Sequence, residues 1–132
     1  MCTVTYFPLK NKIVLTSNRD EKPNRSAQEI HREKGIFYPK DATKNGTWFA
    51  VSENGNALIL LNGAFENHPV KTNYRKSRGL IVLDLIAEED IFESIELIDL
   101  ENIEPFTLVI FQEKQLAEFR WRPTGPWQTP LR

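Results

Sequence analysis

Cys2 is the residue with the clearest chemical potential in this sequence. It is the single cysteine, and it directly follows the initiator methionine. Because methionine is ordinarily removed before a small residue, we expect cysteine to become the mature N-terminus. An α-amino group titrates at a pKa of about 7.7–8.0 and can accept the thiol proton, so one residue would supply both nucleophile and base. The alternative interpretation is a small apolar residue that opens a strand.

A hairpin is predicted to bring other reactive side chains to Cys2. Residues 2–7 and 13–18 are rich in β-branched and aromatic types, and residues 8–12 between them favour a turn. Folding back about this turn places residues 17–20 opposite Cys2. Distance along the sequence would therefore become contact in space.

A charged tetrad ends the second strand of this hairpin. A guanidinium from Arg19 beside the thiol would favour the reactive thiolate, and the carboxylate of Asp20 could hold the terminal amine. Since side chains alternate along a strand, both reach Cys2 only if the strand ends or bulges between them. The alternative is a solvated charged turn. The tetrad consists of Asn18, Arg19, Asp20 and Glu21.

Asn62 is a further candidate for the site because it follows directly after a predicted strand. The segment Ala57–Leu61 is predicted to pair with Gly46–Ser52 through an Asn-Gly turn, and Asn62 with Gly63 follows at its end. A side-chain amide that projects beyond a strand end could donate a hydrogen bond to an oxyanion. A simple Asn-Gly turn is the alternative interpretation.

The remaining segments predict an α+β fold in which strands and helices are segregated. The stretch 19–45 shows no sustained period and is expected to be a long, functional excursion with a short strand at 36–38. The other expected elements are helices from about 80 to 86, with Ser77 as cap, and from 91 to 97, with Asp90 as cap, then strands over 106–111 and 115–122.

Composition limits the class of protein. The chain has 132 residues, of which 40% are hydrophobic and 27% charged, so we expect one globular domain over 1–132. Its 17 Lys plus Arg balance 18 Asp plus Glu, which argues against a nucleic-acid partner. With no long apolar run and no secretory signal pattern, we expect a cytoplasmic protein without stable membrane insertion, and we expect no metal or other cofactor.

Several short motifs, taken in order, resemble the NRDE family, whose animal member is called transport and Golgi organisation protein 2. The family is similar in turn to cysteine N-terminal-nucleophile (Ntn) hydrolases such as penicillin V acylase and bile-salt hydrolase. The motifs are Met1-Cys2, the tetrad 18–21, Asp41 with Gly46-Thr47-Trp48, Asn62-Gly63 and Ser77-Arg78-Gly79.

The resemblance implies an αββα layered sandwich and assigns roles within it. Cys2 would be the nucleophile and its amine the base, with Arg19 contacting the thiol. Asp20 would position the amine, with Glu21 as the competing carboxylate, and Asn62 would stabilise the oxyanion. Possible supporting residues are Asn18 and Arg78.

These expectations lead to a hydrolase of a small-molecule, non-peptide amide or ester. The alternative from the resemblance is a non-catalytic carrier for a hydrophobic ligand, haem-like or lipid-like, and a third option is an assembly domain. The chain is shorter than the relatives in the family, which predicts an incomplete second sheet. An open edge at Phe106–Phe111 would then favour a homodimer.

Overall fold

The computed structural model describes residues 2–63, 71–122 and 127–130, the last of these by their backbone. A two-stranded sheet is made of β1 and β2, and a seven-stranded antiparallel sheet runs in the order β3-β4-β5-β6-β7-β8-β9. The helices α1 and α2 lie between β6 and β7 in the sequence. The elements are β1 (Thr3–Pro8), β2 (Ile13–Asn18), the short 3-10 helix η1 (Pro23–Arg25), β3 (Ile30–Glu33), β4 (Ile36–Pro39), β5 (Phe49–Ser52), β6 (Ala57–Asn62), α1 (Arg78–Ile86), α2 (Ile91–Leu97), β7 (Phe106–Gln112), β8 (Gln115–Trp121) and β9 (Trp127–Pro130).

The β1–β2 hairpin confirms the first sequence prediction. Leu9 N–H donates to the carbonyl of Lys12 at 2.8 Å and closes the turn. The two strands then pair from Pro8 with Ile13 to Thr3 with Asn18. Cys2 therefore lies at the open end of the hairpin, beside the residues that follow β2.

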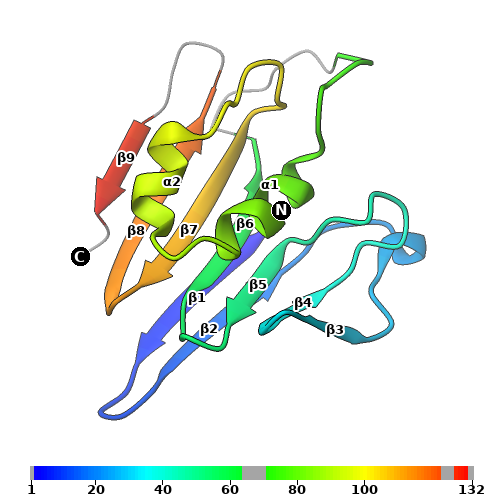
Figure 1. The fold of residues 1–132 in the computed structure, drawn as a ribbon. Coiled ribbons are helices and arrows are strands. Elements are labelled where there is room, and N and C mark those ends of the chain that lie inside the picture. Colours follow the sequence, from blue (N-terminus) through cyan, green and yellow to red (C-terminus); the bar gives the residue numbers. More distant parts are fainter. Residues whose placement is uncertain (1, 64–70, 123–126, 131–132) are drawn as a thin grey trace.

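Three layers build the molecule (Figure 1). Both helices cover one face of the seven-stranded sheet, and the β1–β2 hairpin lies against the other face. Tyr6 of β1 packs its ring 6.3 Å from that of Phe111 of β7 across this second interface. The predicted α+β class is confirmed. A second helical layer, which the resemblance implied, is not found among the described residues.

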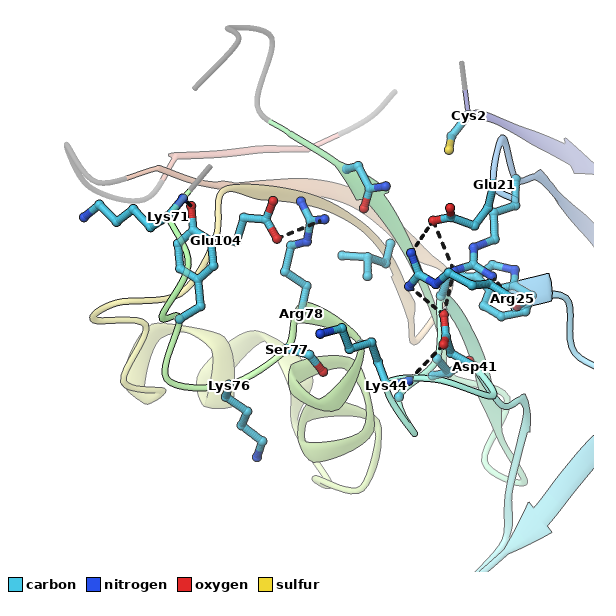
Figure 2. A pocket seen from close by; sticks show the side chains of 18 of the residues that line it. Cys2, Glu21, Arg25, Asp41, Lys44, Lys71, Lys76, Ser77, Arg78 and Glu104 are labelled. Atoms are coloured by element: carbon cyan, nitrogen blue, oxygen red, sulfur yellow. Dashed lines mark hydrogen bonds and ion pairs between the residues drawn. The ribbon is translucent and has the colours of Figure 1, made fainter. Parts of the chain in front are cut away.

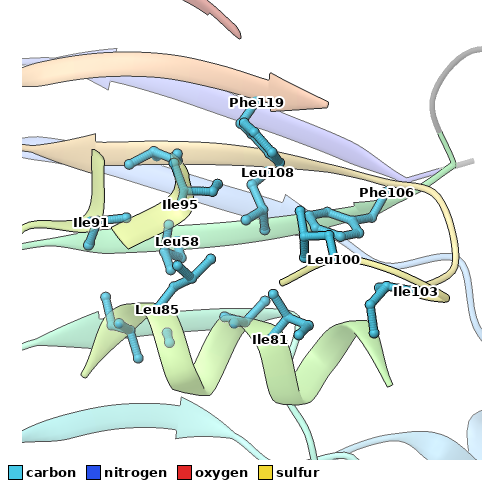
Figure 3. Close-up of a cluster of buried hydrophobic side chains, with 14 of the residues drawn as sticks. Leu58, Ile81, Leu85, Ile91, Ile95, Leu100, Ile103, Phe106, Leu108 and Phe119 are labelled. Carbon is cyan, nitrogen blue, oxygen red and sulfur yellow. The ribbon is translucent and has the colours of Figure 1, made fainter. Parts of the chain in front are cut away.

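The main core lies between the helices and the sheet (Figure 3). Ile81 and Leu85 of α1 are at most 2% exposed and pack with Leu58 and Leu108 from the central strands. Full burial of one such side chain contributes about 1.5–3 kcal/mol. The repeat of apolar residues on α1 therefore fixes the helix to the sheet and sets the position of its first turn.

Both predicted helices are present, and their ends differ in how they are capped. The carboxylate of Asp90 accepts a hydrogen bond from Glu93 N–H at 3.1 Å, which confirms it as the cap of α2. The buried Gln112 of β7 accepts a second bond at 2.8 Å from Ile91 N–H. Ser77 precedes α1 in an extended conformation, but its hydroxyl makes no capping hydrogen bond.

The sheet corrects two expectations. The short strand expected at 36–38 is present as β4, but the segment 19–45 also holds η1 and the strand β3, because Lys34 and Gly35 both adopt positive φ and turn the chain tightly from β3 into β4. The strand expected from Gly46 begins only at Phe49. Just before it, Thr47 N–H donates to the carbonyl of Gly79 in α1, while the carbonyl of Trp48 accepts a hydrogen bond from Leu60 N–H of β6.

The open edge expected at Phe106–Phe111 is also wrong. β7 is an inner strand, with β6 on one side and β8 on the other. The outer strands of the seven-stranded sheet are β3 and β9. Neither helix in the described part of the chain has the length and apolarity needed to cross a membrane.

Candidate functional site

One cavity gathers side chains from segments that lie far apart in the chain (Figure 2). Its volume is about 350 Å³, and Cys2, Arg19, Glu21, Asn62 and Arg78 all line it. These residues come from the start of β1, the segment after β2, the end of β6 and the start of α1. The structure thus brings together five of the seven residues singled out from the sequence.

Cys2 contributes the thiol at one side of the cavity. Its side chain is half-buried and not part of a disulfide. In Figure 2 the sulfur points toward the side of the cavity where Glu21 lies. A thiol in this position is reachable by a small molecule in the cavity.

Arg19 is held in one orientation by three contacts. Its Nη2 lies 2.8 Å from Oδ2 of Asp41, and its Nη1 donates to the carbonyl of Arg25 at 3.0 Å. The guanidinium carbon lies 4.0 Å from the centroid of the Trp48 ring. A cation over an aromatic face contributes about 0.5–2 kcal/mol, so the ring and the carboxylate together fix the guanidinium.

Asp41 is the centre of this arrangement, and its side chain is only 5% exposed. Besides Arg19, it accepts hydrogen bonds from Arg25 at 2.7 Å and from the backbone N–H groups of Thr43 and Lys44 at 2.9 and 3.0 Å. Burial alone would raise the pKa of Asp41. The backbone bond from Lys44, the Arg19 and Arg25 guanidinium groups and the bond from Thr43 outweigh it and hold this pKa well below its ordinary value.

The two candidate carboxylates after β2 have different surroundings. Glu21 pairs with Arg25 at 2.5 Å and lies 3.7 Å from Arg19, so it belongs to the arginine network. Asp20 is exposed, and a hydrogen bond and charge attraction from the chain's amino terminus lower its pKa. β2 ends at Asn18, so Arg19 and Asp20 both lie outside the strand and are not bound by its alternation of side chains.

Neither Asn18 nor Asp20 lines the cavity. Asn18 is exposed at the last position of β2, where it pairs with Thr3. It therefore supports the hairpin that carries Cys2 rather than the wall of the cavity.

Asn62 ends β6 at the cavity wall. Gly63 follows with a φ of +78°, which turns the backbone away from the strand direction. The turn is tied to β7, because Thr107 Oγ1 donates to the carbonyl of Gly63 at 2.9 Å. Asn62 is exposed as the last residue of β6, and it lines the cavity.

A close backbone contact positions α1 against the cavity. A Cβ atom on Gly46 would lie 2.5 Å from the carbonyl carbon of Gly79, so both positions require glycine. Thr47 N–H donates to the carbonyl of Gly79 at 3.1 Å in the same contact. The motifs Gly46-Thr47-Trp48 and Ser77-Arg78-Gly79 therefore meet in this contact, which explains the glycine in each.

Arg78 begins α1 and lies along the cavity. Its side chain is 17% exposed, its Nη1 donates to the carbonyl of Pro105 at 3.0 Å, and its Nη2 lies 3.2 Å from Glu104. Burial lowers the pKa of Arg78, and the charge of Glu104 works against that shift. The resemblance named Arg78 only as a supporting residue, and the structure places it as a cation of the cavity wall.

Arg25 was missed in the sequence, although it contacts both Glu21 and Asp41. The polar segment after Asp41 favours a turn in which an aspartate side chain accepts backbone hydrogen bonds. That signal could have marked Asp41 as a fixed carboxylate and therefore as a partner for Arg25. Within residues 2–63, 71–122 and 127–130, no three His, Cys, Asp or Glu side chains cluster in a way that could hold a metal ion.

Fold and site together define an α+β layered protein with a cysteine at the end of a hairpin, facing a charged cavity. The chain matches the family model described as Transport and Golgi organisation 2 over residues 1–124, and it belongs to this family. The NRDE resemblance is therefore confirmed, while the likeness to Ntn hydrolases remains a prediction. A search of the curated proteins finds no match to the chain.

Proposed function

We propose that this protein is a cysteine hydrolase of the Ntn type, acting on a non-peptide amide or ester of a small molecule. The observation that carries the proposal is that Cys2, Arg19 and Asn62 line one cavity. A nucleophile, a fixed cation and an amide donor on the same wall are the groups that acyl transfer requires.

The chemistry follows from these groups. Removal of Met1 frees the amine of Cys2, which accepts the thiol proton, and the sulfur then attacks the substrate carbonyl. Asn62 donates a hydrogen bond to the oxyanion of the tetrahedral intermediate. The amine returns the proton to the leaving amine or alcohol as the carbon–heteroatom bond breaks, and water then hydrolyses the thioester on Cys2.

Two carboxylates have separate parts in this proposal. Asp20 holds the freed amine of Cys2; in the chain that still carries Met1, the amino terminus already lowers the pKa of Asp20. Asp41 acts through Arg19, which it fixes by the 2.8 Å ion pair in the wall of the cavity. Asp41 is therefore a positioning residue rather than a catalytic one.

A carrier for a hydrophobic ligand is the second candidate function. The cavity favours the hydrolase, because charged and polar side chains dominate its wall and Leu60, Trp48 and Tyr74 are the larger apolar or aromatic members. An apolar ligand would leave these charged groups desolvated and without new partners.

Turnover of p-nitrophenyl butyrate by the wild type and the Cys2→Ala variant tests the proposal. We expect the substitution to lower kcat/KM by several orders of magnitude, because the variant has no nucleophile. Cys2→Ser is the matched variant that keeps a small second residue and a weaker nucleophile. Equal turnover by wild type and Cys2→Ala would reject the proposal and favour a carrier.

A further inference from the structure

The cavity is far more cationic than the molecule as a whole. The full chain has a formal net charge of −1. Among the described residues that line the cavity, cations outnumber carboxylates by six to three. The cations are Arg19, Arg25, Lys44, Lys71, Lys76 and Arg78, and the carboxylates are Glu21, Asp41 and Glu104. The ammonium of Lys76 is neutralised by Asp84, which lies outside this lining.

The two halves of the cavity differ in how this charge is balanced. On the Cys2 side, the two arginines face two carboxylates, since Arg19 and Arg25 pair with Asp41 and Glu21. The two positive and two negative charges of this network balance one another. The uncompensated positive charge therefore lies on the side of α1.

Lys44 is the clearest unpaired cation on that side. It makes no ion pair within the part of the chain that the structure describes, and its ammonium is exposed to the cavity. Its backbone is fixed, because its N–H donates to Asp41 and the Asp41 N–H donates to the carbonyl of Gly46 at 2.8 Å. In Figure 2 its side chain points toward the start of α1, where Ser77 and Arg78 lie.

Ser77 supplies a second, uncharged group at the same place. Its hydroxyl oxygen is buried and has no hydrogen-bond partner among the described residues. A buried hydroxyl without a protein partner is unusual, and it leaves a free donor and acceptor in the lining of the cavity. The first turn of α1 adds partial positive charge at this point.

We propose that this end of the cavity binds an oxyanion of the substrate, a carboxylate or a phosphate, between Lys44, Ser77 and Arg78. The inference rests on the proposed function in taking the bound molecule as the substrate, and it names that substrate's class: an acyl compound with an acidic group. Lys44 provides the unpaired charge and Ser77 the hydrogen bond. Arg78, already paired with Glu104, fixes the geometry of the wall.

Calorimetric titration with three probes of equal chain length tests this site: hexanoate, hexyl phosphate and the neutral hexanamide. We expect at least one anion to bind about tenfold or more tightly than hexanamide. The Lys44→Gln substitution should remove most of that preference. Lys10→Gln, at the exposed β1–β2 turn, is the matched control and should keep it. The tighter of the two anions identifies the carboxylate or the phosphate as the natural group.

The same titration on the Cys2→Ala variant separates this inference from the proposed function. That variant lacks the proposed nucleophile, so an anion preference retained in it supports the oxyanion site even if no hydrolysis is ever found. Equal affinity for hexanoate, hexyl phosphate and hexanamide, binding of none of them, or an unchanged preference in Lys44→Gln would overturn the inference.

Discussion

Asp41 and Arg19, which are 22 positions apart in the sequence, lie 2.8 Å from each other in the wall of the cavity. The carboxylate is buried, and it accepts four hydrogen bonds from side chains and backbone. Its charge is thus shared between the guanidinium groups and the loop that follows it. This one residue couples the stability of the fold to the geometry around Cys2.

Removal of this carboxylate should be costly. We expect Asp41→Ala to lower the free energy of unfolding by about 3–5 kcal/mol, because two partly buried arginines would lose their partner. Glu53→Ala is the matched control, since its ion pair with Arg32 at 2.8 Å lies at the surface. That substitution should cost no more than about 1 kcal/mol. Urea unfolding of both variants measures the difference, and equal losses would argue against a central role for Asp41.

The stability of the protein should depend on acid pH through the same group. A carboxyl whose pKa is lowered in the folded state contributes stability above its ordinary pKa, here 3.8, and loses it as the pH falls below that value. We therefore expect the urea midpoint of the wild type to fall more steeply between about pH 5 and pH 2 than that of Asp41→Asn. Parallel curves for the two proteins would contradict this assignment.

The contact between Gly46 and Gly79 should tolerate no side chain. We expect Gly46→Ala to destabilise the protein by about 1–3 kcal/mol or more, because the new Cβ meets backbone that cannot move aside alone. Gly55→Asn is the control: no atom lies within 4 Å of a Cβ there, and asparagine tolerates positive φ. Thermal or urea unfolding would show the contrast, and a neutral Gly46→Ala would mean that α1 can shift freely.

Asn62 should matter for turnover but not for folding. With p-nitrophenyl butyrate as substrate, we expect Asn62→Ala to lower kcat about 10²–10³-fold, since it removes one oxyanion donor. Its stability should change by no more than about 0.5 kcal/mol, because the side chain is exposed beyond the end of β6. Asn54→Ala, in the β5–β6 turn, is the matched control. A normal kcat in Asn62→Ala would remove this residue from the proposed machinery.

Local signals predicted much of the fold. The β1–β2 hairpin, the Asn-Gly turn before β6 and the cap of α2 all follow from neighbouring residues, and each is present. The hairpin β3–β4 was missed because its turn, at Lys34 and Gly35, lacks the usual asparagine or aspartate and its first strand is largely exposed. The inner place of β7 depends on pairing between distant segments, which no local pattern encodes.

In the candidate site, too, the residues positioned by local structure were predicted, and those positioned by long-range contacts were not. The short hairpin was enough to place Arg19 beside Cys2, and the family resemblance added Asn62; all three line the cavity. The role of Asp41 and the presence of Arg25 depend on the path of residues 19–45 through space. A chain segment without periodicity gives no register from which such contacts could be predicted.

Intact-mass spectrometry of the purified protein after brief treatment with p-nitrophenyl acetate tests the central claim most directly. The account predicts a mass lower by one methionine residue and higher by one acetyl group, with peptide mapping placing that group on Cys2. Slower acetylation of Cys2 in the Arg19→Ala variant would support a role for the guanidinium in favouring the reactive thiolate. Retention of Met1, or acetylation that is spread over lysines and spares Cys2, would contradict the account.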